Sequence, residues 1–384
     1  MRNLKSLLLV LCVPILSNCG FEETERIRVI DVTKVLYQPR EISLSHLASD
    51  VEYIQLETTE NSLINKRLRL FANEDNIVAI SYRQILVFER KTGRFLREIS
   101  NYGRNPGSYM STIDVLPFEE ETNTIYARGN SKKLEFSLKG DLKNEIVTPE
   151  NSFTTAKIND ENYVGYALNY NGNEKVKLVI FDSLGNVIQT FPNYLVAPKS
   201  KSIHVYKPNG WFYKYNSQLY FCEQFNDTLF HITAEGISPR YVLSRGKFSP
   251  PYNKQTVGFP MSEYFMYNHI YESERFLFYT FDFEKEKHTA VFDKSNMEVM
   301  VGDYSQSDGS GFTNDMAGFF PMKISSINNN NELIGFLEAH EIIQWFDDNP
   351  QLVKELPKEL RTYQKMSESD NPVVIIAKLS TTEQ

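Results

Sequence analysis

The stretch Ile85-Leu-Val-Phe-Glu-Arg-Lys-Thr-Gly-Arg-Phe-Leu-Arg-Glu-Ile99 decides the fold, because its pattern occurs five times along the chain. It consists of an apolar strand, a polar turn and a second strand. The other copies have the same order and are Leu134–Ile146, Leu178–Thr190, Thr228–Leu243 and Thr289–Met300. Their turn residues are of types that tolerate a positive φ, namely Gly93, Gly140, Gly185, Gly236 and Asn296.

The spacing of these copies predicts a β-propeller. Successive turn residues are 47, 45, 51 and 60 residues apart. A period of about 40–50 residues with about four strands in each unit is typical of that fold. Lys323–Ile327 and Glu332–Leu337 begin a sixth unit. The sequence therefore predicts an all-β, six-bladed β-propeller over residues 40–384.

The last blade is predicted to combine both ends of the chain. Residues from about 338 to 366 carry apolar side chains at spacings of three and four, which indicates a helical insertion that Pro357 should split. Asn371–Leu379 then returns to strand. Val51–Glu57 alternates as a half-buried strand does, and it can supply the missing strand. This pairing would close the ring and remove exposed sheet edges.

The N-terminus has the pattern of an export signal. Arg2 and Lys5 precede an apolar run, Leu7–Leu16, that is much shorter than the roughly 20 residues of a membrane-spanning helix. Residues 1–18 are therefore expected to be removed. Leu16-Ser-Asn-Cys19 resembles a bacterial lipobox, so Cys19 is expected to be lipidated and residues 19–39 to form a tether. The alternative is a plain secretory signal with an incidental cysteine.

Composition limits the partners. The acidic stretch Gly20–Glu25 leaves open which face of the outer membrane the anchored protein occupies. Cys222 is the one cysteine besides Cys12 and Cys19, so the mature chain is expected to lack an intrachain disulfide, and its strand-like surroundings predict a buried small hydrophobe. The net charge of −8 without a basic stripe argues against nucleic acid as a partner.

Several phrases together resemble the six-bladed β-propeller lipoproteins of unknown function, of the NHL/TolB-like type, found in gut-type diderm bacteria. These phrases are Val51–Thr59, Leu86–Phe95, Tyr102–Tyr109, Phe225–Phe230 with Pro239–Val242, and Asn371–Val374. The resemblance implies a propeller lipoprotein of the cell envelope and brings no established chemistry.

Two segments depart from that family's pattern. The family's Gly-Arg-Gly-Pro-Gly-Glu-Tyr is here Gly103-Arg-Asn-Pro-Gly-Ser-Tyr109, and its Asp-Phe-Gly-Lys is Ser244-Arg-Gly-Lys247. If those acidic positions serve a ligand in relatives, this chain binds it differently or not at all.

Two groups of residues are candidates for ligand binding. In and beside the Gly103–Tyr109 loop, Arg104, Tyr102 and Tyr109 have side chains that can bind an anionic or hydroxylated ligand. The alternative is a structural turn, in which the arginine donates hydrogen bonds to backbone carbonyls and the tyrosine packs in the protein core. Aromatic residues are also dense near the starts of blades four and five: Tyr206, Trp211, Tyr213, Tyr215, Tyr264, Tyr267 and Tyr271. Trp211 and Tyr215 are the candidates chosen from this second group, and the alternative is blade core.

No metal site, cofactor or catalytic residue is predicted. The six histidines lack metal-ligand spacing, and neither His-Glu-x-x-His nor Gly-x-Ser-x-Gly occurs. Asn226-Asp-Thr228 is interpreted as a turn that starts a strand. The loop with Asp303, Asp308, Asn314 and Asp315 lacks the EF-hand order, so calcium binding is left open there.

The leading functional hypothesis is a non-catalytic binding or scaffold module, anchored at the outer membrane. Its ligand would be a glycan, a peptide or a partner outer-membrane protein, bound on the face that carries the Arg104 loop. The alternative is an enzyme of hydrolase, lyase or lactonase type with its site in the central funnel. A single sequence leaves this alternative open, because a catalytic pair of carboxylates from different blades would have no characteristic spacing in the sequence.

Overall fold

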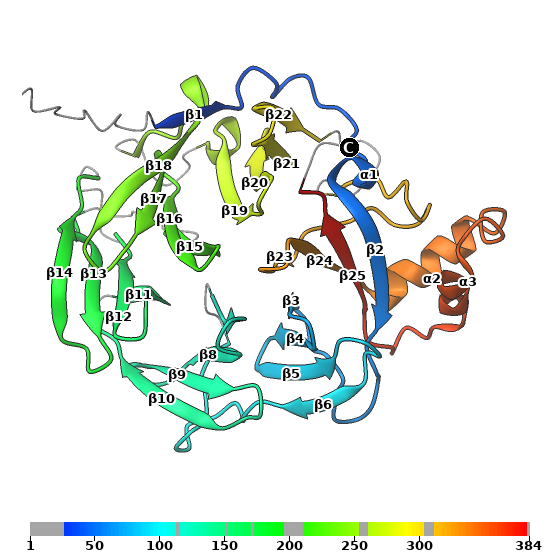
Figure 1. Ribbon diagram of the computed structural model, residues 1–384, viewed down its shortest axis with the longest axis horizontal. Coiled ribbons are helices and arrows are strands. Elements are labelled where there is room, and N and C mark those ends of the chain that lie inside the picture. Colours follow the sequence, from blue (N-terminus) through cyan, green and yellow to red (C-terminus); the bar gives the residue numbers. More distant parts are fainter. Residues whose placement is uncertain are drawn as a thin grey trace, which may run out of the picture.

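Six small sheets stand in a ring around a central axis in the computed structural model of the chain (Figure 1). The structure describes residues 27–112, 116–150, 152–169, 173–195, 210–252, 260–302 and 311–381. The ring confirms the predicted six-bladed β-propeller. No helix in the described ranges is both long and apolar enough to cross a bilayer.

Each of the first five blades follows one of the five sequence repeats. Blade one contains β3 (Arg69–Ala72), β4 (Asn76–Ser81), β5 (Gln84–Glu89) and β6 (Phe95–Glu98). Blade two contains β7 (Phe118–Glu119), β8 (Thr124–Arg128), β9 (Lys132–Ser137) and β10 (Leu142–Val147). Blade three contains β11 (Ser152–Lys157), β12 (Asn162–Ala167), β13 (Val176–Asp182) and β14 (Val187–Pro192).

The fourth and fifth blades complete the series. Blade four contains β15 (Gly210–Tyr215), β16 (Gln218–Glu223), β17 (Asn226–Ile232) and β18 (Ile237–Ser244). Blade five contains β19 (Met266–Glu272), β20 (Phe276–Phe283), β21 (Glu286–Asp293) and β22 (Glu298–Val301). Short 3₁₀ turns, η1 (Gly246–Phe248) and η3 (Met261–Glu263), lie between these two blades in the sequence.

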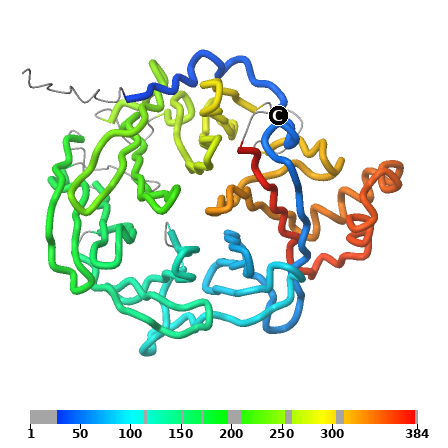
Figure 2. Tube along the Cα trace, viewed as in Figure 1, coloured from blue at the N-terminus to red at the C-terminus, as the bar shows by residue number. Residues whose placement is uncertain are grey.

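Blade six is assembled from both ends of the chain, as predicted. Its strands are β23 (Ser326–Ile327), β24 (Glu332–Leu337), β25 (Val373–Leu379) and the N-terminal β2 (Ala48–Gln55). β2 and β25 are antiparallel, with Val51 opposite Ala377 and Gln55 opposite Val373. Figure 2 shows the blue N-terminal segment beside the red C-terminal strand. This pairing joins the N-terminal and C-terminal parts of the chain in one sheet and closes the ring.

The segment expected to be a tether contains an additional strand. β1 (Arg28–Asp31) adds to blade four in parallel with β18, with Val29 opposite Val242. Ile30 and Val32 are buried there, each 2% exposed. The prediction of a tether as far as residue 39 is corrected by this strand, which covers the outer edge of blade four. Residues 19–26 lie outside the described ranges.

The helical insertion of blade six is confirmed and is split at Pro357. It contains α2 (Ala339–Asp348), α3 (Lys358–Arg361) and a 3₁₀ turn, η4 (Thr362–Lys365). Glu338 and Glu341 form a reciprocal capping box at the start of α2. The short α1 (Leu44–Leu47) lies directly before β2. The insertion and α1 bury apolar side chains in the same core as blades five and six.

The hairpin glycines explain how neighbouring blades approach each other. Gly93, Gly140 and Gly185 have φ of 71°, 98° and 84°, which glycine adopts without steric cost. At Gly93 a Cβ atom would lie 2.0 Å from the backbone oxygen of Gln55 in the adjacent blade. Gly236 is not among the described glycines with a positive φ, and in the Asn296 turn the positive φ falls on Met297 (66°).

A glycine series tests this packing. Gly93→Ala is expected to lower the free energy of unfolding by more than about 2 kcal/mol, because two costs combine. The alanine Cβ would clash with the backbone of Gln55, and an alanine is strained at a positive φ. Gly140→Ala adds strain alone, since nothing lies within 4 Å of its Cβ position, and is expected to cost about 1 kcal/mol. Gly236→Ala should change stability by less than about 0.5 kcal/mol. Urea denaturation of the three variants checks this order; equal effects would contradict it.

The blade interfaces hold most of the core. Aromatic rings pack between the sheets, for example Tyr166 of blade three on Phe221 of blade four, with ring centroids 5.3 Å apart. Cys222 is 3% exposed, and burial raises the pKa of its thiol well above the usual value. It is therefore the buried small hydrophobe that the sequence indicated.

Candidate functional site

The antiparallel order of the strands gives the propeller two chemically different faces. In blades one to five the first and third turns lie at one face, which we call the turn face. The second turn and the connection to the next blade lie at the opposite face, which we call the linker face. The innermost strands of the six blades, β3, β7, β11, β15, β19 and β23, surround the axis between the two faces.

At the turn face, one turn of blade two bridges the ring. Glu119 bonds Lys214 of blade four, and Glu121 accepts a hydrogen bond from Ser217. The backbone N–H of Asn329 in blade six donates to Glu120 at 2.9 Å. Burial raises the pKa of Glu120 to about 7. Because blades four and six are not neighbours of blade two, these contacts connect blades across the axis.

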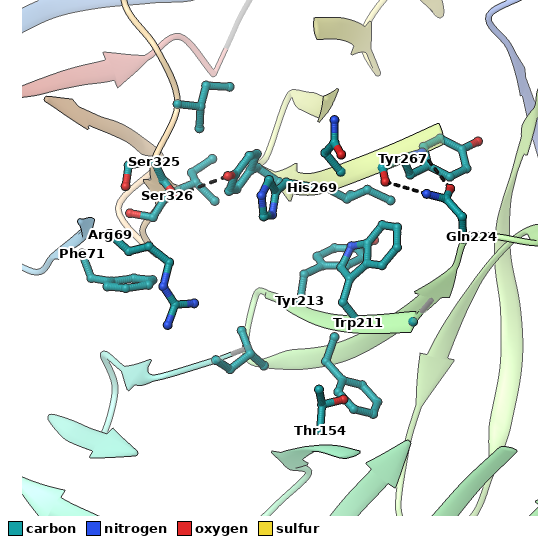
Figure 3. A pocket seen from close by; sticks show the side chains of 18 of the residues that line it. Arg69, Phe71, Thr154, Trp211, Tyr213, Gln224, Tyr267, His269, Ser325 and Ser326 are labelled. Atoms are coloured by element: carbon teal, nitrogen blue, oxygen red, sulfur yellow. Dashed lines mark hydrogen bonds between the residues drawn. The ribbon is translucent and has the colours of Figure 1, made fainter. Parts of the chain in front are cut away.

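The inner strands enclose a cavity of about 1350 Å³ (Figure 3). Its walls include the first residues of inner strands, together with the turns β8–β9 and β20–β21 of the linker face. Gln224 of blade four joins Tyr267 of blade five in its wall through two hydrogen bonds, of 2.9 and 2.7 Å. The cavity is therefore associated with the linker face, opposite the bridging turn.

The cavity is basic although the whole chain is acidic. Among the described residues that line it, eight carry positive charge: Arg69, Arg128, Lys132, Lys133, Lys214, Lys285, Lys287 and Lys323. Three carry negative charge: Asp282, Glu338 and Glu341. The net charge of the chain is −8. The cavity therefore concentrates positive potential where an anion would enter.

Three of these cations are available to a ligand. Arg128, Lys285 and Lys287 are exposed, and no other described residue forms an ion pair with them. Lys132 and Lys323 lie 2.5 Å and 3.5 Å from Glu145 and Glu341, respectively. Partly exposed pairs of this kind are weak, so these two lysines can also respond to an anion.

One wall of the cavity combines aromatic and polar groups. Figure 3 shows the indole of Trp211 projecting from β15 beside Tyr213, with Thr154 of blade three below it. The ring of Trp211 meets Tyr267 edge-on, at a centroid distance of 6.5 Å and an angle of 65°. Arg69 and His269 project into the same cavity. Trp211 is thus the sequence candidate that the structure places in the channel.

The other candidates lie elsewhere. Tyr109 is fully buried, its hydroxyl donates to the carbonyl of Arg83 at 3.0 Å, and burial raises its pKa. Tyr102 is 43% exposed and lies 4.5 Å from the Arg83 guanidinium. Arg104 is exposed on the linker face and does not line the cavity. Tyr215 lies between blades four and five, with Lys294 4.4 Å from its ring.

In the loop that contains Asn314 and Asp315, the described residues have structural roles. Asp315 accepts a hydrogen bond of 2.9 Å from the backbone N–H of Ser45, and Asn314 bonds the hydroxyl of Tyr53. Asp303 and Asp308 lie outside the described residues, as do Cys19 and Tyr206. Within the described residues, no three His, Cys, Asp or Glu side chains form a group that suits a metal ion.

Comparison with protein families gives a clear match. Residues 27–378 match the family described as a domain of unknown function, DUF4934. The chain belongs to this family. The match covers all six blades. No curated protein is similar enough in sequence to count as a match.

Two solved structures from Bacteroides species are similar. A Bacteroides fragilis protein classed as exported has a TM-score of 0.67 and 18% identity, with 92% of this chain and 99% of that chain covered. A protein of unknown function from Bacteroides thetaiotaomicron has a TM-score of 0.41 and 11% identity, covering 88% of this chain and 74% of that chain. At its identity, the first similarity establishes the shared fold of the DUF4934 chain.

Proposed function

We propose that this protein is an exported, lipid-anchored binding module that holds an anionic ligand in its central channel without converting it. The observation that carries the proposal is the excess of eight basic over three acidic residues lining the cavity of an acidic chain. Of the ligand classes expected from the sequence, an anionic glycan or an acidic peptide fits this charge. A partner outer-membrane protein would have to insert an acidic segment.

The carboxylates of the cavity support binding rather than turnover. Asp282 accepts a hydrogen bond of 2.8 Å from Asn268. Glu338 and Glu341 form the capping box of α2, and Glu341 also lies near Lys323. Burial and the charge of Glu341 raise the pKa of Glu338. Each described carboxylate of the cavity thus has a structural partner, whereas a funnel enzyme would need acid and base groups directed at a substrate.

Removal of the available cations tests the proposal. The triple substitution Arg128→Ala, Lys285→Ala and Lys287→Ala is expected to weaken binding of oligogalacturonate or oligoglutamate by at least about tenfold at low salt. Added salt should reduce the difference. Isothermal calorimetry of the mature chain measures both effects. Arg104→Ala should have a smaller effect, because Arg104 lies outside the cavity wall.

A matched control removes the same kind of charge from the turn face. Lys91→Ala with Lys139→Ala should leave binding unchanged, because these exposed lysines lie in third turns. Equal losses in both variants, or no binding of either polyanion to the wild-type chain, would contradict the proposal. Mass analysis of the recovered ligand addresses the enzyme alternative, which cleaved product would favour.

Lipid anchoring is the second part of the proposal. The similarity to an exported Bacteroides fragilis protein supports export, and the lipobox-like Leu16-Ser-Asn-Cys19 supports attachment at an outer-membrane face. Cys19→Ser is expected to move the mature protein from the membrane fraction to the soluble fraction and to abolish acyl labelling. Cys222→Ser is the matched control and should keep the anchor. Unchanged fractionation of Cys19→Ser would contradict lipidation.

A further inference from the structure

We infer that the ligand of the central channel is a long, linear polyanion that continues out of the cavity over the linker face of blades one and two. It would follow what we call the basic track, which consists of residues 65–69, 81–84, 99–112 and 128–132. This inference rests on the proposed function and makes it more specific, because it sets the length of the anion and adds a second binding site outside the cavity.

The four segments of the basic track belong to the linker face. Two of them are the second turns of blades one and two, and the other two belong to the connections that precede these blades. The track contains seven basic and no acidic residues, although the whole chain has 41 basic and 49 acidic residues. The basic residues are Lys66, Arg67, Arg69, Arg83, Arg104, Arg128 and Lys132. Such a concentration of positive charge attracts a polyanion.

Hydrogen bonds connect the basic track to the wall of the cavity. The backbone N–H of Met110 donates to the carbonyl of Arg128, a cavity residue, at 2.7 Å. The guanidinium of Arg69, which projects into the cavity in Figure 3, donates to the carbonyl of Thr112 at 3.2 Å. The hydroxyl of Thr112 donates in turn to the carbonyl of Ser81 at 2.9 Å. The second turn of blade one therefore lies beside the cavity wall, and an anion can pass between them along basic surface.

This second turn presents a preformed site for an anionic group. The guanidinium of the exposed Arg83 lies 4.7 Å from the ring of Tyr82 and 4.5 Å from that of Tyr102. The two tyrosines are 46% and 43% exposed, so the site is open to solvent. The carbonyl of Arg83 accepts the hydrogen bond of the buried Tyr109. Because these contacts hold the cation in place, an anion that binds it costs less ordering entropy.

Two connected cationic sites favour a ligand that is long enough to reach both. A short anion binds one site at a time, whereas a linear polyanion held in the channel meets the Arg83 site at a high effective concentration. An extended peptide of three residues spans about 10 Å, and one of 20 residues spans about 66 Å. Substitutions at the Arg83 site should therefore weaken only the longer ligand.

The test compares two lengths of one polyanion. Triglutamate and a 20-residue oligoglutamate are titrated into the mature chain and into the double variant Arg83→Ala with Arg104→Ala, by calorimetry at low salt. The wild type is expected to bind the long peptide at least about tenfold more tightly than triglutamate. The double variant should bind the long peptide about tenfold more weakly than the wild type does, and triglutamate within about twofold of the wild-type affinity.

A matched control removes two positive charges from another turn of the same blade. Lys91 and Arg94 are exposed in the third turn of blade one. Lys91→Ala with Arg94→Ala should leave both affinities within about twofold of the wild-type values, because this turn lies outside the basic track. Arg83→Lys keeps a cation at the site and should retain most of the affinity for the long peptide. Thermal melting verifies that each variant folds.

The outcomes separate the inference from the proposed function. An unchanged affinity of the double variant for the long peptide, an equal loss for both lengths, or an equal loss in the control would overturn the inference, while polyanion binding still supports the proposed function. Failure of the wild-type chain to bind either peptide would overturn both. If the double variant keeps its affinity for the long peptide but loses binding to phosphatidylglycerol vesicles, the track contacts a membrane and the inference is overturned.

Discussion

Glu272→Gln is expected to lower the free energy of unfolding by about 3 kcal/mol, a large loss for one atom exchanged. The side chain of Glu272 is 0% exposed, and its carboxylate lies 2.7 Å from Arg240 and 2.8 Å from Lys294. The hydroxyl of Tyr213 donates to it at 3.1 Å. Neutralising this carboxylate leaves two cations between blades four and five without their counter-charge, and desolvation of unpaired charge is costly.

The control for this substitution is an ion pair at the surface. Glu298 pairs with Arg40 at 2.7 Å, and the two side chains are 45% and 50% exposed. Solvent screens such a pair, so Glu298→Gln should change stability by less than about 1 kcal/mol. Chemical denaturation of both variants gives the comparison. Similar losses for the two variants would show that the Glu272 network does not stabilise the blade interface.

The sequence was sufficient for the architecture because each blade repeats one local pattern. The strand–turn–strand copies gave the blade count and order, and the unpaired Val51–Glu57 segment predicted closure with the C-terminal strand. β1 was missed because Arg28–Asp31 is short and belongs to no repeat. β1 forms because it pairs with β18 at the edge of blade four, and this contact between distant parts of the chain leaves no local sequence pattern.

The candidate site was less predictable, because the ring itself assembles it. Trp211 could be found, since aromatic residues are dense at the starts of the inner strands. The sequence does not indicate Arg128, Lys285 and Lys287, because they lie in or beside the second turns of blades two and five and come to line one cavity only when the ring closes. Arg104 was a candidate because it is a charged residue in a Gly/Pro-rich loop, but it does not line the cavity.

Deleting residues 20–57 of the mature chain is expected to abolish cooperative folding. The deletion removes β2, which pairs along the length of β25, and it removes α1. Four large apolar side chains, Leu44, Leu47, Ile54 and Leu56, are at most 5% exposed there. Burial of four such side chains contributes about 6–12 kcal/mol. This is comparable with the whole stability of a typical domain, about 5–15 kcal/mol.

Two shorter deletions separate the role of β2 from that of β1. Removing residues 20–26 keeps β1, α1 and β2 and should leave the melting temperature unchanged. Removing residues 20–40 strips β1 and its buried Ile30 and Val32 and should lower the melting temperature while the ring stays closed. Circular dichroism follows all three deletions, and a peptide of residues 41–58 added to the longest one should restore a folding transition. A cooperative, near-native melt of the 20–57 deletion without the peptide would mean that blade six is stable with three strands, and that N-terminal closure does not hold the ring together.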